Sequence, residues 1–217
     1  MIRGSIYGHV GNYQNAIEDY SQAIRIDPHK AGAYTVRALA QINSGNMQKA
    51  VEDYTQALTI NPKDVDSYFN RGNTRSNLGD KRGAIQDYNQ VTCINPQHLD
   101  AYNRRASLRF ELEDYQGAIA DLNQVLRIDP NDVYAYNNRG FFRYKLGDIQ
   151  GAIKDYHQAL RIDPDYIRVY LNLSAAHSDL EDYLGVIADC KQILRIDSKN
   201  ADAYNNQGNA RYMLGDN

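Results

Sequence analysis

The stretch ALRIDP at residues 159–164 closes an apolar run with an Asp-Pro pair, and close variants of it recur along the chain. They are AIRIDP at 23–28, ALTINP at 57–62, VTCINP at 91–96 and VLRIDP at 125–130. All five prolines of the chain lie in these strings at intervals of 34 residues, and Ser198 stands where a sixth would fall. Self-similarity at a fixed period is typical of repeats that stack on one another, so we do not expect one globular domain.

The composition indicates a soluble protein with no general affinity for nucleic acid or lipid. The 217 residues are 42% hydrophobic with a net charge of −3, the mean hydropathy is −0.66, and no apolar run approaches the roughly 20 residues of a membrane span. A charge so close to balance attracts neither nucleic acid nor anionic membranes. The first residues lack the apolar stretch of a signal peptide, and Cys93 and Cys190 are too few for a disulfide framework or a metal site. We therefore expect a cytoplasmic protein without metal or other cofactor.

Frames of 34 residues make the repeat visible at single positions. We predict a single array over 1–217, with complete repeats at 31–64, 65–98, 99–132, 133–166 and 167–200 between partial repeats at 1–30 and 201–217. From the first complete frame onward position 4 is Tyr, position 8 is small, and position 20 is Ala or Val. Position 24 is usually Tyr. The position-4 residues are Tyr34, Tyr68, Tyr102, Tyr136, Tyr170 and Tyr204.

This order of aromatic, small, Ala, aromatic and Pro resembles the tetratricopeptide repeat (TPR) over the whole chain. It is a bacterial-type form with Tyr in place of Trp at position 4, and it also has Arg in place of Leu at position 7. The resemblance implies an all-α fold, a right-handed superhelical solenoid of antiparallel helix pairs with about six repeats plus a terminal helix.

Periodicity independently predicts two amphipathic helices in each frame. Positions 4, 8 and 11 share one stripe at 100° per residue, and positions 20, 24 and 27 share another. Position 16, between them, is Asn or Asp in every copy and predicts an N-cap for the second helix. ALRIDP is then the end of a second helix, stopped by proline, and not a binding motif. The predicted caps are Asn12, Asn46, Asp80, Asp114, Asp148, Asp182 and Asp216.

An arginine column at position 7 lies on a face that ought to be apolar. In a helical hairpin, position 7 lies level with position 23, which is acidic in every complete copy. We therefore predict an Arg–Asp pair within each repeat, partly buried where the two helices meet. The alternative, a chain of charges that serves catalysis or ligand capture, is less favoured because a repeated pair suits a lattice better than a single site. The arginines are Arg3, Arg37, Arg71, Arg105 and Arg139, and the acids are Asp19, Asp53, Asp87, Asp121, Asp155 and Asp189.

No catalytic constellation is recognisable. The phosphate-binding, zinc-protease and nucleophile-elbow motifs are all absent. The nearest approach to a triad, Ser174, His177 and Asp179, is a helical neighbourhood that we read as structural. We predict that the protein is not an enzyme.

The opposite stripe of the first helix is the candidate binding surface. Positions 2, 5, 6, 9, 12 and 13 face away from the hairpin partner, and the TPR resemblance implies that they line a concave, peptide-binding groove. We call this set the first-helix stripe. Asn dominates position 6, and its amide can pair with both polar groups of an extended peptide. The alternative is a solvated face copied by duplication. The stripe comprises Phe69, Asn70, Asn73, Asn103, Arg104, Tyr134, Asn137, Asn138, Phe141, Tyr144, Arg168, Asn172, Asn205, Asn206 and Asn209.

Two functions fit these observations. The first is a non-enzymatic scaffold or adaptor that binds a peptide or helical segment of a partner in the groove. The alternative is the TPR region of a longer enzyme or regulatory protein, seen as a fragment. Positions 2 and 5 supply no basic stripe for RNA, and the lack of Lys at position 5 argues against the clamp with which one TPR subclass grips chaperone tails. Because both terminal repeats are uncapped, we also expect self-association through them.

Overall fold

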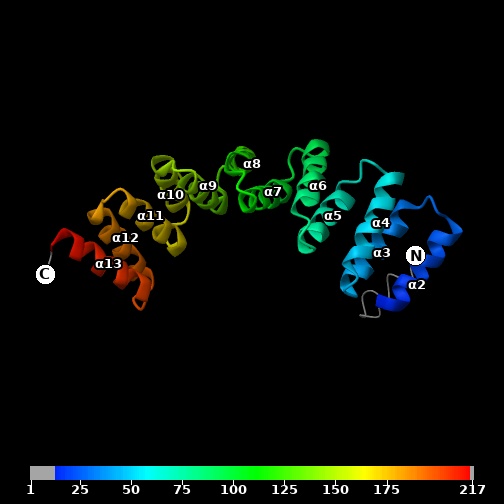
Figure 1. Cartoon of the computed structure of the whole chain (residues 1–217), viewed down its shortest axis with the longest axis horizontal. Helices are drawn as coiled ribbons and strands as arrows, with labels where there is room; N and C mark the ends of the chain where they lie inside the picture. Colours follow the sequence, from blue (N-terminus) through cyan, green and yellow to red (C-terminus); the bar gives the residue numbers. More distant parts are fainter. Residues whose placement is uncertain (1–12, 216–217) are drawn as a thin grey trace. The chain divides into compact units, whose positions relative to one another are not determined.

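The computed structural model describes residues 13–215, which form helices and turns without a strand. The predicted all-α fold is confirmed, and Figure 1 labels the helices in chain order. They are α2 (Tyr13–Ile26), α3 (Ala31–Asn43), α4 (Met47–Ile60), α5 (Val65–Asn77), α6 (Lys81–Ile94), α7 (Leu99–Glu111), α8 (Tyr115–Ile128), α9 (Val133–Lys145), α10 (Ile149–Ile162), α11 (Ile167–Asp179), α12 (Tyr183–Ile196) and α13 (Ala201–Leu214).

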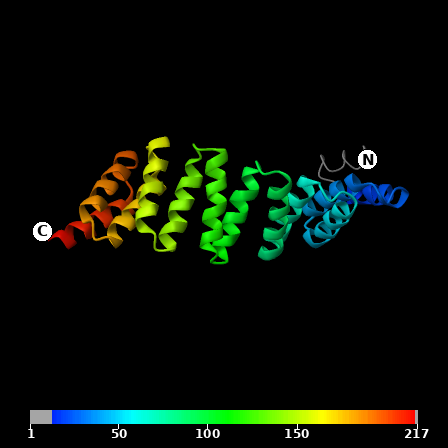
Figure 2. The same ribbon diagram turned by 90° about the horizontal axis from the view of Figure 1, so that it is seen from above.

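Each complete frame holds one helix pair. The first helices begin at the first residue of the frame and have 13 residues, and the second helices have 14. The chain falls into two compact units, Met1–Leu108 and Arg109–Asn217. Within each unit, Figures 1 and 2 show consecutive helices side by side and running in alternate directions. The repeat solenoid is therefore established for each unit, whereas the single array and its right-handed winding stay predictions.

The turn inside each pair uses a left-handed residue at position 15. Gly45, Gly79 and Gly147 adopt φ values of 84°, 85° and 90° there. Glu113 and Glu181 occupy the same position with φ values of 62° and 57°. Glycine adopts this conformation without steric cost whereas glutamate does not, so two of the five turns carry backbone strain.

The predicted N-caps are confirmed with a side-chain hydrogen bond at four second helices, whereas Asn46 stands at the N-cap position of α4 without such a bond. Asp148 accepts a hydrogen bond from the Gly151 N–H at 2.9 Å, and Asp80, Asp114 and Asp182 bond the equivalent glycines. A Cβ at those glycines would collide with the capping carboxylate. At α4 the equivalent residue is Lys49, and Asn46 instead donates to Ser44 Oγ at 2.9 Å. Asn12 and Asp216 lie outside the described residues.

In three complete hairpins the core is built from the position 20 alanine and the position 24 tyrosine, whereas α8 has Leu122 and α12 has Val186 and Cys190 at these buried positions. Ala152 and Tyr156 on α10 are both fully buried. A Cβ placed on Gly140 of α9 would lie 2.6 Å from Tyr156 Cε1, and one on Gly72 of α5 would lie 2.9 Å from Tyr88 Cε1. At Gly72 and Gly140 the residue at position 8 must be small because the tyrosine ring of the second helix lies against it.

Membrane insertion finds no support in the described helices, because none of them combines the length and apolar character that crossing a bilayer requires.

Candidate peptide-binding surface

The predicted Arg–Asp pairs are present in three repeats. Arg139 donates to Asp155 through Nε at 2.9 Å and Nη2 at 2.6 Å, and the pairs Arg37–Asp53 and Arg71–Asp87 have the same bidentate geometry. Such a fork is the strong form of the charge-assisted hydrogen bond. The carboxylates are buried, and Asp155 is only 2% exposed. The pair Arg105–Asp121 stays a prediction, and Arg3 lies outside the described residues.

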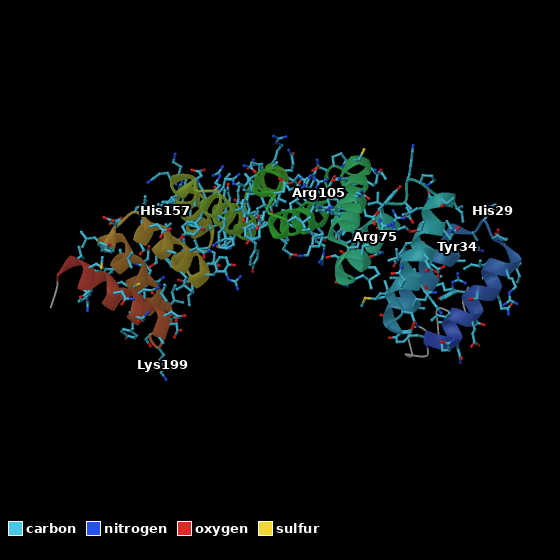
Figure 3. The ribbon with its side chains drawn as sticks, viewed as in Figure 1. His29, Tyr34, Arg75, Arg105, His157 and Lys199 are labelled. Carbon is cyan, nitrogen blue, oxygen red and sulfur yellow. The ribbon has the colours of Figure 1, made fainter. Side chains whose placement is uncertain are left out.

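In three repeats a second arginine, not predicted from the sequence, donates a further hydrogen bond to the buried carboxylate. Arg75 (Figure 3) stands at position 11 and donates through Nη1 to Asp87 Oδ2 at 2.9 Å. Arg109 and Arg143 bond Asp121 and Asp155 in the same way. The period of 34 residues at position 11 would have revealed this column. We call the arginines at positions 7 and 11, together with the aspartates at position 23, the charge lattice. Because two guanidiniums share the oxygens of one buried carboxylate, the charge lattice holds the two helices of a hairpin together.

The last complete repeat departs from this lattice. Leu173 replaces the position-7 arginine, and Asp189 pairs instead with His177, whose Nδ1 lies 2.8 Å from Asp189 Oδ2. Burial raises the pKa of Asp189 to about 6, although the hydrogen bond with His177 opposes the shift. Asp179 accepts a 2.6 Å hydrogen bond from the Tyr144 hydroxyl. Because His177 and Asp179 bond different partners, the triad-like residues form no catalytic relay.

In the first unit the stripe residues Phe69 and Asn73 contact their own hairpin partner, α6. Phe69 is half-buried, and its ring centroid lies 4.7 Å from that of His98 and 5.9 Å from that of Tyr88 on α6. Asn73 Oδ1 accepts a 2.8 Å hydrogen bond from the Tyr88 hydroxyl. Both side chains therefore stabilise the packing of α5 on α6, in addition to any contact with a partner. Asn70 is half-buried beside them.

In the second unit three stripe asparagines bond one another. Asn172 Nδ2 donates to Asn137 Oδ1 at 2.9 Å, and Asn137 Nδ2 donates to Asn138 Oδ1 at 3.2 Å. Asn137 is only 4% exposed. This ladder joins the first helices α9 and α11, so much of its hydrogen-bonding capacity is already used within the protein.

Aromatic side chains of α7 and α9, among them the stripe residues Phe141 and Tyr144, form a cluster at the end of α9. Phe110 stacks on Phe142 with centroids 4.4 Å apart and lies 5.4 Å from Phe141. Lys145 Nζ lies 5.5 Å from the Phe141 centroid and 5.8 Å from that of Tyr144, within cation–π range. The cluster is a half-buried apolar surface with a cation over it.

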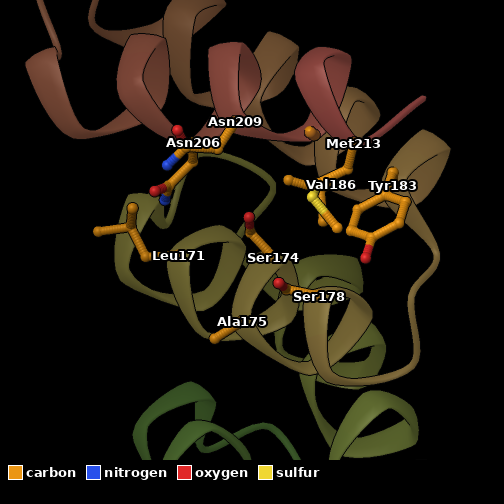
Figure 4. A pocket seen from close by; sticks show the side chains of 10 residues that line it. Leu171, Ser174, Ala175, Ser178, Tyr183, Val186, Asn206, Asn209 and Met213 are labelled. Carbon is orange, nitrogen blue, oxygen red and sulfur yellow. The ribbon is translucent and has the colours of Figure 1, made fainter. Parts of the chain in front are cut away.

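Two stripe residues, Asn206 and Asn209, line a pocket between α11 and α13. Its volume is about 230 Å³, and Figure 4 shows Asn206 and Asn209 of α13 facing Leu171 and Ser174 of α11, with Met213 at one end. Both asparagine amides thus lie beside apolar walls, which is the mixture expected of a peptide subsite.

The remaining stripe residues are more scattered. Tyr134 is 68% exposed and packs edge-on against Tyr166 with centroids 5.7 Å apart. Arg104, Arg168 and Asn205 are exposed, and Asn103 is half-buried.

Helix pairs at a 34-residue period, closed by buried aromatic and small residues, define a tetratricopeptide repeat protein, a class of protein–protein interaction scaffolds. The chain belongs to the family described as the ETO1 C-terminal domain, whose model matches residues 3–182. No curated protein matches the chain.

Three solved structures illustrate the shared fold. The MamA protein superposes with a TM-score of 0.73 at 22% identity, over 79% of this chain and 94% of its own. YrrB, described as a TPR protein with an unusual peptide-binding site, gives 0.74 at 16% identity, over 88% and 99%. A tetratricopeptide repeat protein from Parabacteroides merdae gives 0.70 at 21% identity, over 99% and 85%. At these identities the likeness establishes the repeat fold alone.

Proposed function

We propose that the chain is a non-enzymatic adaptor that binds a peptide or helical segment of a protein partner along the first-helix stripe. The observation that carries this proposal is the pocket between α11 and α13, in which Asn206 and Asn209 lie beside the apolar walls of Leu171 and Met213. The amides would hold the peptide main chain and the walls would hold one apolar side chain. YrrB, a protein of the same fold, is described as having a peptide-binding site.

The other residues of the first-helix stripe differ in how accessible they are to a partner. The exposed residues Arg104, Tyr134 and Arg168 would contact the partner, whereas Asn137 is too buried to do so without rearrangement. The aromatic cluster beneath Lys145 is a second apolar contact. The cytoplasm suits this adaptor because Cys93 and Cys190 are free thiols. If the chain is part of a longer enzyme or regulator, the same pocket would recruit that protein's partner.

The test is a selection of peptides against the chain from a displayed random library. Peptides that bind should lose at least tenfold in affinity to the double variant Asn206→Ala/Asn209→Ala, measured by fluorescence polarisation. The matched control is Asn131→Ala, an exposed asparagine in the turn between α8 and α9 that belongs neither to the stripe nor to the pocket lining. Retention of full affinity by the double variant would show that partners use another face.

Self-association is a second property that we propose, through the outward face of α13. Tyr204 and Tyr212 on this helix are 56% and 80% exposed. Gly208 stands at position 8, where Gly72 and Gly140 receive a tyrosine ring, yet a Cβ added there would meet no described atom within 4 Å. Such an apolar face favours association. Light scattering over a concentration series should show a rising mass, and a constant monomer mass would refute it.

A further inference from the structure

The first complete repeat lacks the second arginine of the charge lattice and has no histidine in its place. Gln41 of α3 stands at position 11, where the next three repeats have Arg75, Arg109 and Arg143. Each of these arginines uses Nη1 to donate to the buried aspartate at 2.8–2.9 Å and to a backbone carbonyl of the second helix at 3.1–3.4 Å. Each Nε also lies 3.6–3.9 Å from the capping aspartate. A guanidinium therefore has a defined place in this fold, surrounded by three acceptors.

In the repeat of Gln41 that place is an open cavity. A pocket of about 330 Å³ lies between α2, α3 and α4, and Gln41, Asn46, Lys49 and Asp53 all line it. Asn46, Lys49 and Asp53 are the counterparts of the three residues that hold Arg75. The shorter Gln side chain thus leaves the guanidinium position empty while its acceptor residues remain.

Acceptors in this cavity have fewer donors than their counterparts. Asp155 Oδ2 accepts from Arg139 Nε and from Arg143 Nη1, both at 2.9 Å. The corresponding oxygen, Asp53 Oδ2, accepts from Arg37 Nε at 2.8 Å, and Gln41 supplies it no second bond. Gln41 Oε1 is itself buried, with the residue 6% exposed, and has no hydrogen-bond partner within residues 13–215. A buried acceptor of this kind is unfavourable until a donor reaches it.

We propose that this cavity binds the guanidinium group of an arginine side chain presented by a protein partner. The planar fork of a guanidinium offers several N–H donors in fixed directions, which suits acceptors that already hold such a group in three other repeats, whereas an ammonium is a point charge. No residue of the first-helix stripe lines the cavity, so the site is independent of the proposed groove.

The charges around the cavity set its affinity. Asp53 and Glu52 are balanced by Arg37 and by Lys49, which replaces the glycine of the other repeats. Lys49 is exposed, so water and salt screen its charge, but it still opposes a cationic ligand. The substitution Lys49→Gly should therefore strengthen binding several-fold.

The experiment titrates the isotope-labelled full chain with N-acetyl-L-arginine amide, which imitates an arginine within a peptide, and follows the NMR signals of Gln41, Lys49 and Asp53. We expect saturable shifts at these residues and at least tenfold weaker binding of N-acetyl-L-lysine amide. Absence of saturable shifts, or equal affinity for the lysine derivative, would overturn the proposal. The guanidinium group could belong to an arginine side chain of a protein or to free arginine, and titration with free L-arginine distinguishes the two. If free L-arginine binds at least tenfold more tightly than the amide, the ligand is not a protein side chain.

The variant Gln41→Arg gives the chain its own guanidinium at this place. It should abolish binding and raise the thermal midpoint, which also verifies that the variant folds. Gln48→Arg, an exposed position on α4 that does not line the cavity, is the matched control and should bind as the unmodified chain does. Undiminished binding by Gln41→Arg would show that the ligand occupies another site.

Discussion

Removal of Asp155 is the most direct test of the charge lattice. Asp155 accepts hydrogen bonds from Arg139 Nε and Nη2 at 2.9 and 2.6 Å and from Arg143 Nη1 at 2.9 Å. In Asp155→Ala both guanidiniums lose this partner, and their side chains are 15% and 26% exposed. Breaking a buried pair on one side costs about 3–5 kcal/mol. Arg143 can turn toward water and Arg139 keeps Asn123, so we expect about 3 kcal/mol, the lower end of that range.

The assay is urea unfolding followed by circular dichroism, with amide exchange in α9 and α10 as a local readout because repeat arrays can unfold in segments. Asp165→Ala is the matched control. Asp165 makes an equally short contact, 2.6 Å to Arg195, but it is 66% exposed, so its loss should cost about 0–1 kcal/mol. If the two variants lose similar stability, the buried lattice carries no special weight and the reasoning is refuted.

Three further predictions concern single positions. Asp189 has a pKa near 6 in the folded state and about 4 when unfolded, so folding takes up a proton between these two values. The contribution of Asp189 to stability is therefore fully present below about pH 4 and is lost as the pH rises through about 6; urea midpoints of the unmodified chain should fall relative to those of Asp189→Asn over this range, and parallel pH profiles would contradict this. Glu113→Gly should raise the unfolding free energy by about 1 kcal/mol, because φ is 62° there; an unchanged or lower value contradicts this. Gly140→Ala should cost about 1–3 kcal/mol by pressing on Tyr156, whereas Gly208→Ala, which meets nothing, should stabilise its helix by up to about 1 kcal/mol in thermal melts.

Most of the fold was predictable because each frame position has one environment. Proline spacing indicated the period, and the Asn/Asp column at position 16 indicated where the second helices begin, as at Ile149 directly after Asp148. The missing side-chain cap bond at Asn46 has a local cause. An aspartate cap in this turn needs a residue without Cβ three positions later, and Lys49 does not meet this requirement. The rule was visible in the sequence as a glycine column, but only the geometry shows why it matters.

The candidate site was less predictable because its contacts cross between helices. The helical period of 100° per residue predicts the direction of each Cβ atom, but it does not predict how far a side chain from a neighbouring helix extends. Tyr88 is long enough to reach round to Asn73 on the nominally opposite face. Asn137 is buried by a different repeat, since Asn172 on α11 bonds it, and a pattern read within one frame cannot contain that contact.

The two departures from the TPR pattern have a common physical basis. Arg139 lies over the Tyr136 ring, with its guanidinium carbon 5.4 Å from the centroid, and Arg37 lies 5.8 Å from Tyr34 in the same way. The Nη1 group of the arginine reaches the second helix of the preceding repeat, where Arg139 Nη1 donates to Asn123 Oδ1 at 2.7 Å. Tyr at position 4 and Arg at position 7 therefore act together, and they join successive repeats through polar contacts.

The lattice also predicts an asymmetry between its acids and its arginines. In the last complete repeat Leu173 replaces the arginine and packs in the core with Tyr156, while the acid keeps a partner at position 11. Arg139→Leu would create this same arrangement, because Asp155 keeps Arg143. A buried pair can be replaced by apolar groups at little cost when no charge is left unpaired. We therefore expect Arg139→Leu to cost about 1 kcal/mol or less, well below Asp155→Ala. Urea unfolding of the two variants side by side tests this, and an equal loss from both would show that the lattice depends on every bond rather than on the absence of an unpaired charge.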